Sequence, residues 1–159
     1  MTLRVRRVVT GHDENGQSIV SIDEISSNLM SRRPGHSSAV IWTTDAVPAN
    51  NNLDIDEGLR DAGECAREGI IFRVIEYGAG VASRMHRTMT VDYAIVMSGK
   101  MDMILDGGKV VKLEAGDVIV QRGTIHDWVN HGPEPCKIAF VLIAAKPVMT
   151  KNGRLGPAG

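Results

Sequence analysis

The chain has 159 residues, of which 43% are hydrophobic, and a formal net charge of −1. These values suit one domain with one buried core, and the balanced charge argues against a general nucleic-acid surface. No apolar run approaches the roughly 20 residues of a membrane helix, and the N-terminus has no uncharged core of the signal-peptide kind. We therefore expect a soluble, cytoplasmic protein with neither nucleic-acid nor membrane partners.

The N-terminal third predicts strands over residues 3–10, 18–22 and 38–43, joined by turn-like and loop-like sequence. In the first strand, Arg4, Arg6 and Arg7 alternate with apolar residues, and we expect their charged face to be solvated. Residues 54–68 are the one segment in which a short helix is expected. Two further histidines, His36 and His131, lie in loop-like sequence, where a solvated surface position is expected.

Short strands are then predicted over residues 92–97, 101–105, 110–113 and 118–120, with an Asp-Gly hairpin turn at 106–108. Val118 and Val120, like Phe140 and Leu142, alternate as core residues would. Regular short strands with glycine-rich turns and little helical periodicity indicate an antiparallel barrel or jelly roll. The two cysteines, Cys65 and Cys136, have no zinc-site spacing and are expected to be reduced thiols.

Two histidine-bearing segments stand out between residues 80 and 130. They read Gly80-x5-His86-x-Thr88-x3-Asp92-x6-Gly99 and Gly116-x6-Gly123-x2-His126-x3-Asn130. Because side chains alternate between the faces of a strand, Arg84, His86 and Thr88 should share one face, and His126 and Trp128 should share another. Two such strands could direct both histidines into one cavity.

These segments resemble the two motifs of the cupin superfamily, of the small single-domain type, over roughly residues 72–145. The first motif is degenerate: Thr88 replaces a second histidine and Asp92 replaces a glutamate, while Gln121 stands at a proline position of the second. The resemblance implies an all-β fold, a cupin jelly-roll barrel (double-stranded β-helix). Additional N-terminal strands in residues 1–64 would pack on the barrel of residues 65–146 or on a partner subunit, and residues 147–159 would form a tail. Cupins are often dimers, so a homodimer is expected.

Three functions are compatible with this pocket. The first is an enzyme of the lyase, decarboxylase or isomerase kind, in which His86, Asp92 and His126 transfer protons on a small acidic or aromatic carbonyl compound. In the second, the same three residues hold a divalent transition metal (Fe, Zn, Ni or Mn) for an oxygenase reaction. The third is a cupin that binds a small-molecule ligand without catalysis.

Other residues are expected to contact the substrate. Arg84, on the predicted face of His86, is the favoured partner for a substrate carboxylate, whereas Arg73 and Arg122 are less favoured, because an arginine on a barrel strand usually points outward. Thr88 and Trp128 should line the pocket, Trp128 as an apolar wall. Tyr93 follows Asp92 and should point to the opposite face.

Overall fold

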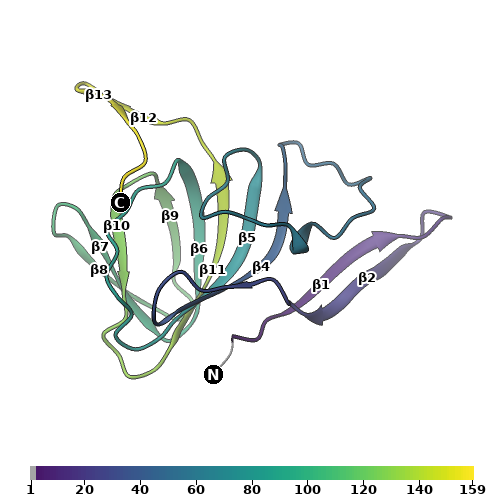
Figure 1. Cartoon of the computed structure of the whole chain (residues 1–159), viewed down its shortest axis with the longest axis horizontal. Helices are drawn as coiled ribbons and strands as arrows, with labels where there is room; N and C mark the ends of the chain where they lie inside the picture. Colours follow the sequence, from purple (N-terminus) through teal and green to yellow (C-terminus); the bar gives the residue numbers. More distant parts are fainter. Residues whose placement is uncertain (1–2) are drawn as a thin grey trace.

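The computed structural model describes residues 3–159, which form an all-β molecule (Figure 1). Its strands are β1 (Arg6–His12), β2 (Ser18–Ile25), β3 (Leu29–Met30), β4 (His36–Thr44), β5 (Ile70–Tyr77), β6 (Thr90–Ser98), β7 (Lys100–Leu105), β8 (Val110–Glu114), β9 (Val118–Arg122), β10 (His126–Val129), β11 (Cys136–Ala144), β12 (Val148–Thr150) and β13 (Gly153–Leu155). The all-β prediction is confirmed.

Two antiparallel sheets face each other and make the barrel. The larger sheet runs in the order β3-β4-β5-β11-β6-β9, and the smaller runs β10-β7-β8. Side chains of both sheets fill the space between them, among them Met101, Val96, Ile138 and Trp128. This arrangement is a jelly roll in which strands distant in sequence become neighbours: β11 inserts between β5 and β6 and pairs with both.

Alternation decides which residues of β6 and β9 enter the barrel. Asp92 is buried and Tyr93 is exposed, as the sequence predicts. On β9, however, Val118 and Val120 are 75% and 63% exposed, so their prediction as core residues is wrong. Ile119 and Gln121 are the residues that turn inward there, and Gln121 lies directly opposite Asp92 in the strand register. The alternation of valines with isoleucine and glutamine does not show which face of β9 is buried. The register with β6 determines which face points into the barrel.

The β1–β2 hairpin extends away from the barrel beside β4 (Figure 1). Arg6 is exposed and pairs with Asp23, as a solvated charged face requires. Arg7 is only 2% exposed, so the prediction that its charge is solvated is wrong. Its guanidinium binds Glu24 of β2, with Nη2 2.6 Å from Oε1, and donates from Nη1 to Asp56 Oδ1 at 2.7 Å. Consecutive residues of a strand face opposite ways, so only one of the two could be solvated.

The other connections are short. Within residues 54–68, only Glu57–Leu59 forms a helical turn, a 3-10 turn that begins at the capping residue Asp56. At the C-terminal end, the β12–β13 hairpin projects from the barrel, and Ala158 then pairs with the backbone of Arg87. In residues 3–159 there is no helix long and apolar enough to span a membrane.

Candidate functional site

One cavity inside the barrel gathers the residues singled out from the sequence. It is lined by all six of them: Arg84, His86, Thr88, Asp92, His126 and Trp128. The floor is formed by the inner face of the larger sheet, where Phe140 and Leu142 of β11 lie between β5 and β6. The site therefore combines polar groups from several strands with an apolar surface.

The two histidines are held together by the backbone. His86 and His126 exchange two N–H to carbonyl hydrogen bonds of 2.9 Å, and their ring centroids lie 4.5 Å apart. Each Nδ1 lies against a backbone carbonyl, that of Arg84 at 2.9 Å for His86 and that of Thr124 at 3.1 Å for His126. A carbonyl oxygen only accepts, so Nδ1 carries the hydrogen in both rings. When such an imidazole is neutral, its Nε2 carries a lone pair that can bind a ligand or accept a proton.

His126 is the more deeply buried of the two, being 2% exposed. Burial lowers the pKa of its imidazole to about 4, and the nearby His86 acts in the same direction. His126 is therefore neutral at physiological pH, and its Nε2 is a hydrogen-bond acceptor.

Asp92 lies on the inner face of β6 and is 4% exposed. Burial raises the pKa of its carboxyl to about 6, against the opposing effects of the Thr90 hydroxyl and the Arg73 charge. Its Oδ1 has no hydrogen-bond partner among the described residues. A carboxyl group with a pKa this close to neutrality can both take up and give back a proton under physiological conditions.

The predicted metal-ligand set was His86, Asp92 and His126. Two Nε2 lone pairs are suitable ligands for a transition metal, and a backbone carbonyl on the other ring nitrogen is the usual arrangement around such ligands. Asp92 does not join them: residues 3–159 contain no group of three His, Cys, Asp or Glu residues placed to hold one ion. The protein groups thus make an incomplete set, because metal sites in proteins ordinarily use three or more ligands.

The loop that carries His86 is held by Asp127, which sequence reasoning missed. Asp127 is buried, and its Oδ1 accepts from the backbone N–H of Arg84 at 2.9 Å and of Trp128 at 2.8 Å. Its Oδ2 accepts from the Ser83 hydroxyl. Asp127 is thus a positioning residue, because it fixes the segment that leads into His86. No motif spacing could indicate this role, since it depends on two strands meeting.

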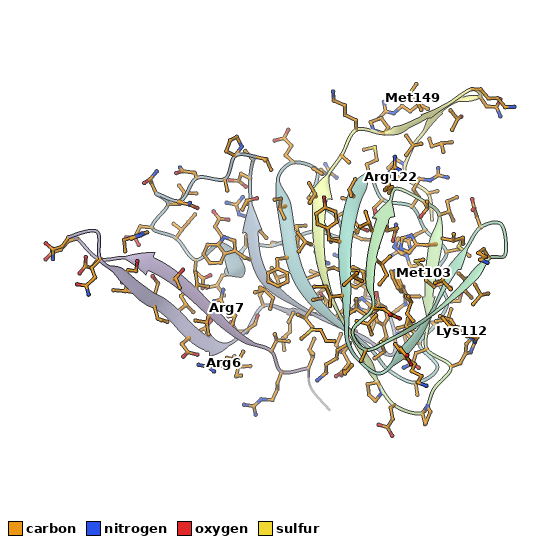
Figure 2. All side chains as sticks on the ribbon, turned by 180° about the vertical axis from the view of Figure 1, so that it is seen from behind. Arg6, Arg7, Met103, Lys112, Arg122 and Met149 are labelled. Atoms are coloured by element: carbon orange, nitrogen blue, oxygen red, sulfur yellow. The ribbon has the colours of Figure 1, made fainter. Side chains whose placement is uncertain are left out.

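The arginines are arranged differently from the prediction. Arg84 lines the cavity, but Glu64 occupies its guanidinium, with Nη2 3.0 Å from Oε2. Arg122 is exposed at the end of β9, below the hairpin that carries Met149 (Figure 2). Arg73, expected to point outward, is instead 3% exposed and faces the cavity from β5. The inner face of β5 therefore holds a charge that its sequence context did not reveal.

His36 also differs from the expectation of a solvated surface residue. It begins β4, is buried, and lies edge-on to Tyr77 with ring centroids 5.6 Å apart. Burial lowers the pKa of its imidazole to about 4, and the neighbouring Arg33 and Arg73 add to the effect. His36 belongs to the cavity wall because the jelly roll brings β4 beside β5.

Trp128 forms the apolar wall that its position after His126 predicts. Its ring is buried and lies edge-on to His126 and Phe140, with centroid separations of 5.7 and 5.5 Å. Thr88 lies at the cavity too, where its hydroxyl shares a 2.8 Å hydrogen bond with that of Thr90. The two cysteines are free, and Cys136 is buried.

Comparison with known proteins identifies the class. The cupin domain family model matches residues 72–143. A cupin-domain-containing oxidoreductase from Neurospora crassa is 33% identical over 157 residues, which cover 94% of this chain and 80% of that protein. Another protein with the same description, from Aspergillus ruber, is 34% identical and covers 95% and 77% of the two chains. The chain belongs to the cupin domain family.

A further relative and two solved structures are also similar to this chain. Phomopsin biosynthesis cluster protein D of Diaporthe leptostromiformis is 32% identical over 94% of this chain and 84% of its own length. Ectoine synthase from P. lautus superposes with a TM-score of 0.54 at 11% identity, over 75% of this chain and 70% of that one. A double-stranded β-helix protein from Klebsiella pneumoniae gives 0.52 at 18% identity, over 75% and 85%. These two structures support the fold alone.

Proposed function

We propose that this cupin is an enzyme of small-molecule biosynthesis that removes and returns a proton on a carbon beside a carbonyl group. The observation that carries the proposal is the buried Asp92 carboxyl, with a pKa of about 6, lining one cavity with two imidazoles whose Nε2 atoms are free. Such a carboxyl is suited to general acid–base catalysis near neutral pH. Membership of a family with relatives named for biosynthesis clusters supports the biosynthetic setting.

In the proposed reaction, the Asp92 carboxylate accepts a proton from the substrate carbon. The carbonyl oxygen gains negative charge as the C–H bond breaks, and the arginines around the cavity favour that charge electrostatically. Return of the proton to a different atom completes an isomerisation. In a lyase reaction the bond from the neighbouring carbon to a leaving group breaks, that group departs with the electron pair, and the proton on Asp92 passes to the departing group. His86 and His126 offer Nε2 as acceptors for a second proton, while Trp128 and Phe140 keep water from the reacting carbon.

The test is proton exchange with solvent. In D₂O, the protein should speed deuterium entry next to the carbonyl of at least one of pyruvate, phenylpyruvate and acetoacetate, followed by NMR. Asp92→Asn should slow this exchange about a hundredfold or more, as expected for loss of an acid–base group. Asp102→Asn, a matched change on β7 outside the cavity, should leave it unaltered. Equal exchange by wild type and Asp92→Asn would contradict the proposal.

A second candidate is an oxidoreductase, favoured by the names of the Neurospora and Aspergillus relatives. The described residues supply two imidazole ligands, fewer than the three or more that a protein metal site ordinarily uses. Bound substrate or water would therefore have to complete the coordination of any metal. Elemental analysis of protein purified without an immobilised-metal step tests this candidate. Stoichiometric Fe, Zn, Ni or Mn that is lost in both His86→Ala and His126→Ala would favour it. A metal content that neither substitution changes would count against it.

A further inference from the structure

The end of the cavity beside β4 and β5 carries three buried nitrogen atoms without hydrogen-bond partners among the described residues. They are Nε of Arg33, Nε of Arg73 and Nδ1 of His36. All three residues line the cavity, and we call them the anion subsite. Buried polar atoms ordinarily find partners, because leaving one unpaired costs about 1–3 kcal/mol.

Arg73 is the centre of the anion subsite. Its guanidinium donates from Nη2 to the Gly63 carbonyl at 2.7 Å, and it forms no ion pair within residues 3–159. Burial lowers the pKa of Arg73 to about 10, and Arg32 adds to the effect, but the group remains charged at neutral pH. A buried charge without an opposite charge in contact is unfavourable unless a ligand supplies one.

The cavity as a whole has an excess of positive charge. Four arginines line it, Arg32, Arg33, Arg73 and Arg84, against two carboxyl groups, Glu64 and Asp92. Glu64 is already bound to Arg84, and Asp92 lies on another strand. Four positive groups against two negative ones leave an excess of two even when both carboxyls are ionised. His36 is neutral in this setting, and its tautomer with the hydrogen on Nδ1 can donate to an anion without adding charge.

The geometry points to a substrate anchored by a carboxylate in the anion subsite, with its reacting carbon toward Asp92. Arg73 lies opposite Phe140, and Asp92 lies opposite Leu142, in the registers of β5-β11 and β11-β6. One strand separates β5 from β6, so their backbones are about 10 Å apart. A small carbonyl acid that lies across Phe140 and Leu142 would reach from the anion subsite at Arg73 to the carboxyl group of Asp92. The planar guanidinium matches the two oxygens of a carboxylate, which makes this the fitting anion.

This inference names the substrate class of the proposed enzyme and rests on that function, but binding can be measured without turnover. Calorimetry with phenylpyruvate and benzoate is compared with their uncharged counterparts, phenylacetone and benzamide. We expect at least one carboxylate to bind at least tenfold more tightly than its uncharged counterpart. Carboxylates that bind no better than the uncharged compounds, or that fail to bind, would overturn the inference.

Arg73→Met should weaken carboxylate binding at least tenfold and leave binding of the uncharged compounds within twofold. Arg33→Met, at the half-buried edge of the anion subsite, should weaken it less, and it provides a second variant if Arg73→Met does not fold. Arg122→Met is the matched control, because this arginine is exposed outside the cavity. Unchanged carboxylate binding in both subsite variants would refute the inference. Carboxylate binding that depends on Arg73, without deuterium exchange in any carbonyl acid, would contradict the proposed function and leave the subsite standing.

Discussion

At the scale of the residue, Asp92 should make the free energy of unfolding of the protein depend on pH. Its folded-state pKa of about 6 exceeds the ordinary value of 3.8, so the unfolded chain loses this proton first as pH rises. Protonated Asp92 therefore contributes fully to the free energy of unfolding below about pH 4. This contribution is lost as pH rises through 6, which lowers the free energy of unfolding by at most about 3 kcal/mol.

Asp92→Asn removes this cost. In urea unfolding, the variant should gain stability over wild type as pH rises from about 4, with the difference levelling off above pH 6 to 7. A difference that does not change with pH would contradict the burial of an ionised carboxylate.

His36 and His126 should act in the opposite direction. The pKa of each folded imidazole is about 4, below the ordinary 6.5, so between these values the unfolded state binds more protons. Their contribution is complete above pH 6.5 and is lost as pH falls through 4. His36→Gln and His126→Gln should each gain stability relative to wild type between pH 7 and 4.5, by up to about 3 kcal/mol. Thermal unfolding across this range measures the gain, and a difference from wild type that is the same at pH 7 and at pH 4.5 would contradict the prediction.

At the scale of the element, Arg7 joins the β1–β2 hairpin to the segment before the 3-10 turn. Its side chain is 1% exposed and contacts both Glu24 and Asp56. Arg7→Met removes the hydrogen bonds to two carboxylates whose side chains are 47% (Glu24) and 23% (Asp56) exposed, and it should cost about 1–3 kcal/mol in urea unfolding. Arg6→Met, the adjacent exposed pair with Asp23, should change little. Equal effects of the two substitutions would show that the buried pair does not hold the hairpin.

The elements also show why alternation alone is an incomplete guide. On β6, the alternation of Asp92, Tyr93 and Ala94 between inside and outside follows the sequence prediction. On β9, Val118 and Val120 look like a core pair but lie on the outer face, since the register with β6 fixes the strand the other way round. Alternation defines two faces of a strand, and the neighbouring strand decides which of them is buried.

At the scale of the whole molecule, the outer face of β6 and β9 carries an apolar patch. Tyr93 lies opposite Val120 and Ile95 opposite Val118, and all four side chains are exposed. β9 is also the edge strand of its sheet. Continuous apolar patches and open edges are usually covered, so we predict that a second copy of the chain binds here across a twofold axis.

Light scattering during size-exclusion chromatography tests the predicted homodimer. Wild type should have the mass of two chains, and the double substitution Val118→Lys with Val120→Lys should have the mass of one, with an unchanged circular dichroism spectrum. Val110→Lys, on β8 of the smaller sheet, is the control and should remain dimeric. A wild-type protein with the mass of one chain would contradict the prediction.

The sequence by itself determined the all-β fold, through its short alternating strands and glycine-rich turns, and it indicated the histidine pair. His86 and His126 could be found because each belongs to a local pattern with fixed spacing. Such patterns report what neighbouring residues along the chain do, since backbone geometry alone sets the direction of successive side chains.

Only the tertiary structure decided that Arg73 and His36 face the cavity and that Glu64 forms an ion pair with Arg84. It also decided that no three His, Cys, Asp or Glu side chains of residues 3–159 are placed to hold one metal ion. These facts arise where β4, β5 and β6 are brought together by closure of the jelly roll, across many residues of sequence. Burial, pairing and the pKa values that follow depend on those distant neighbours, and no local spacing encodes them.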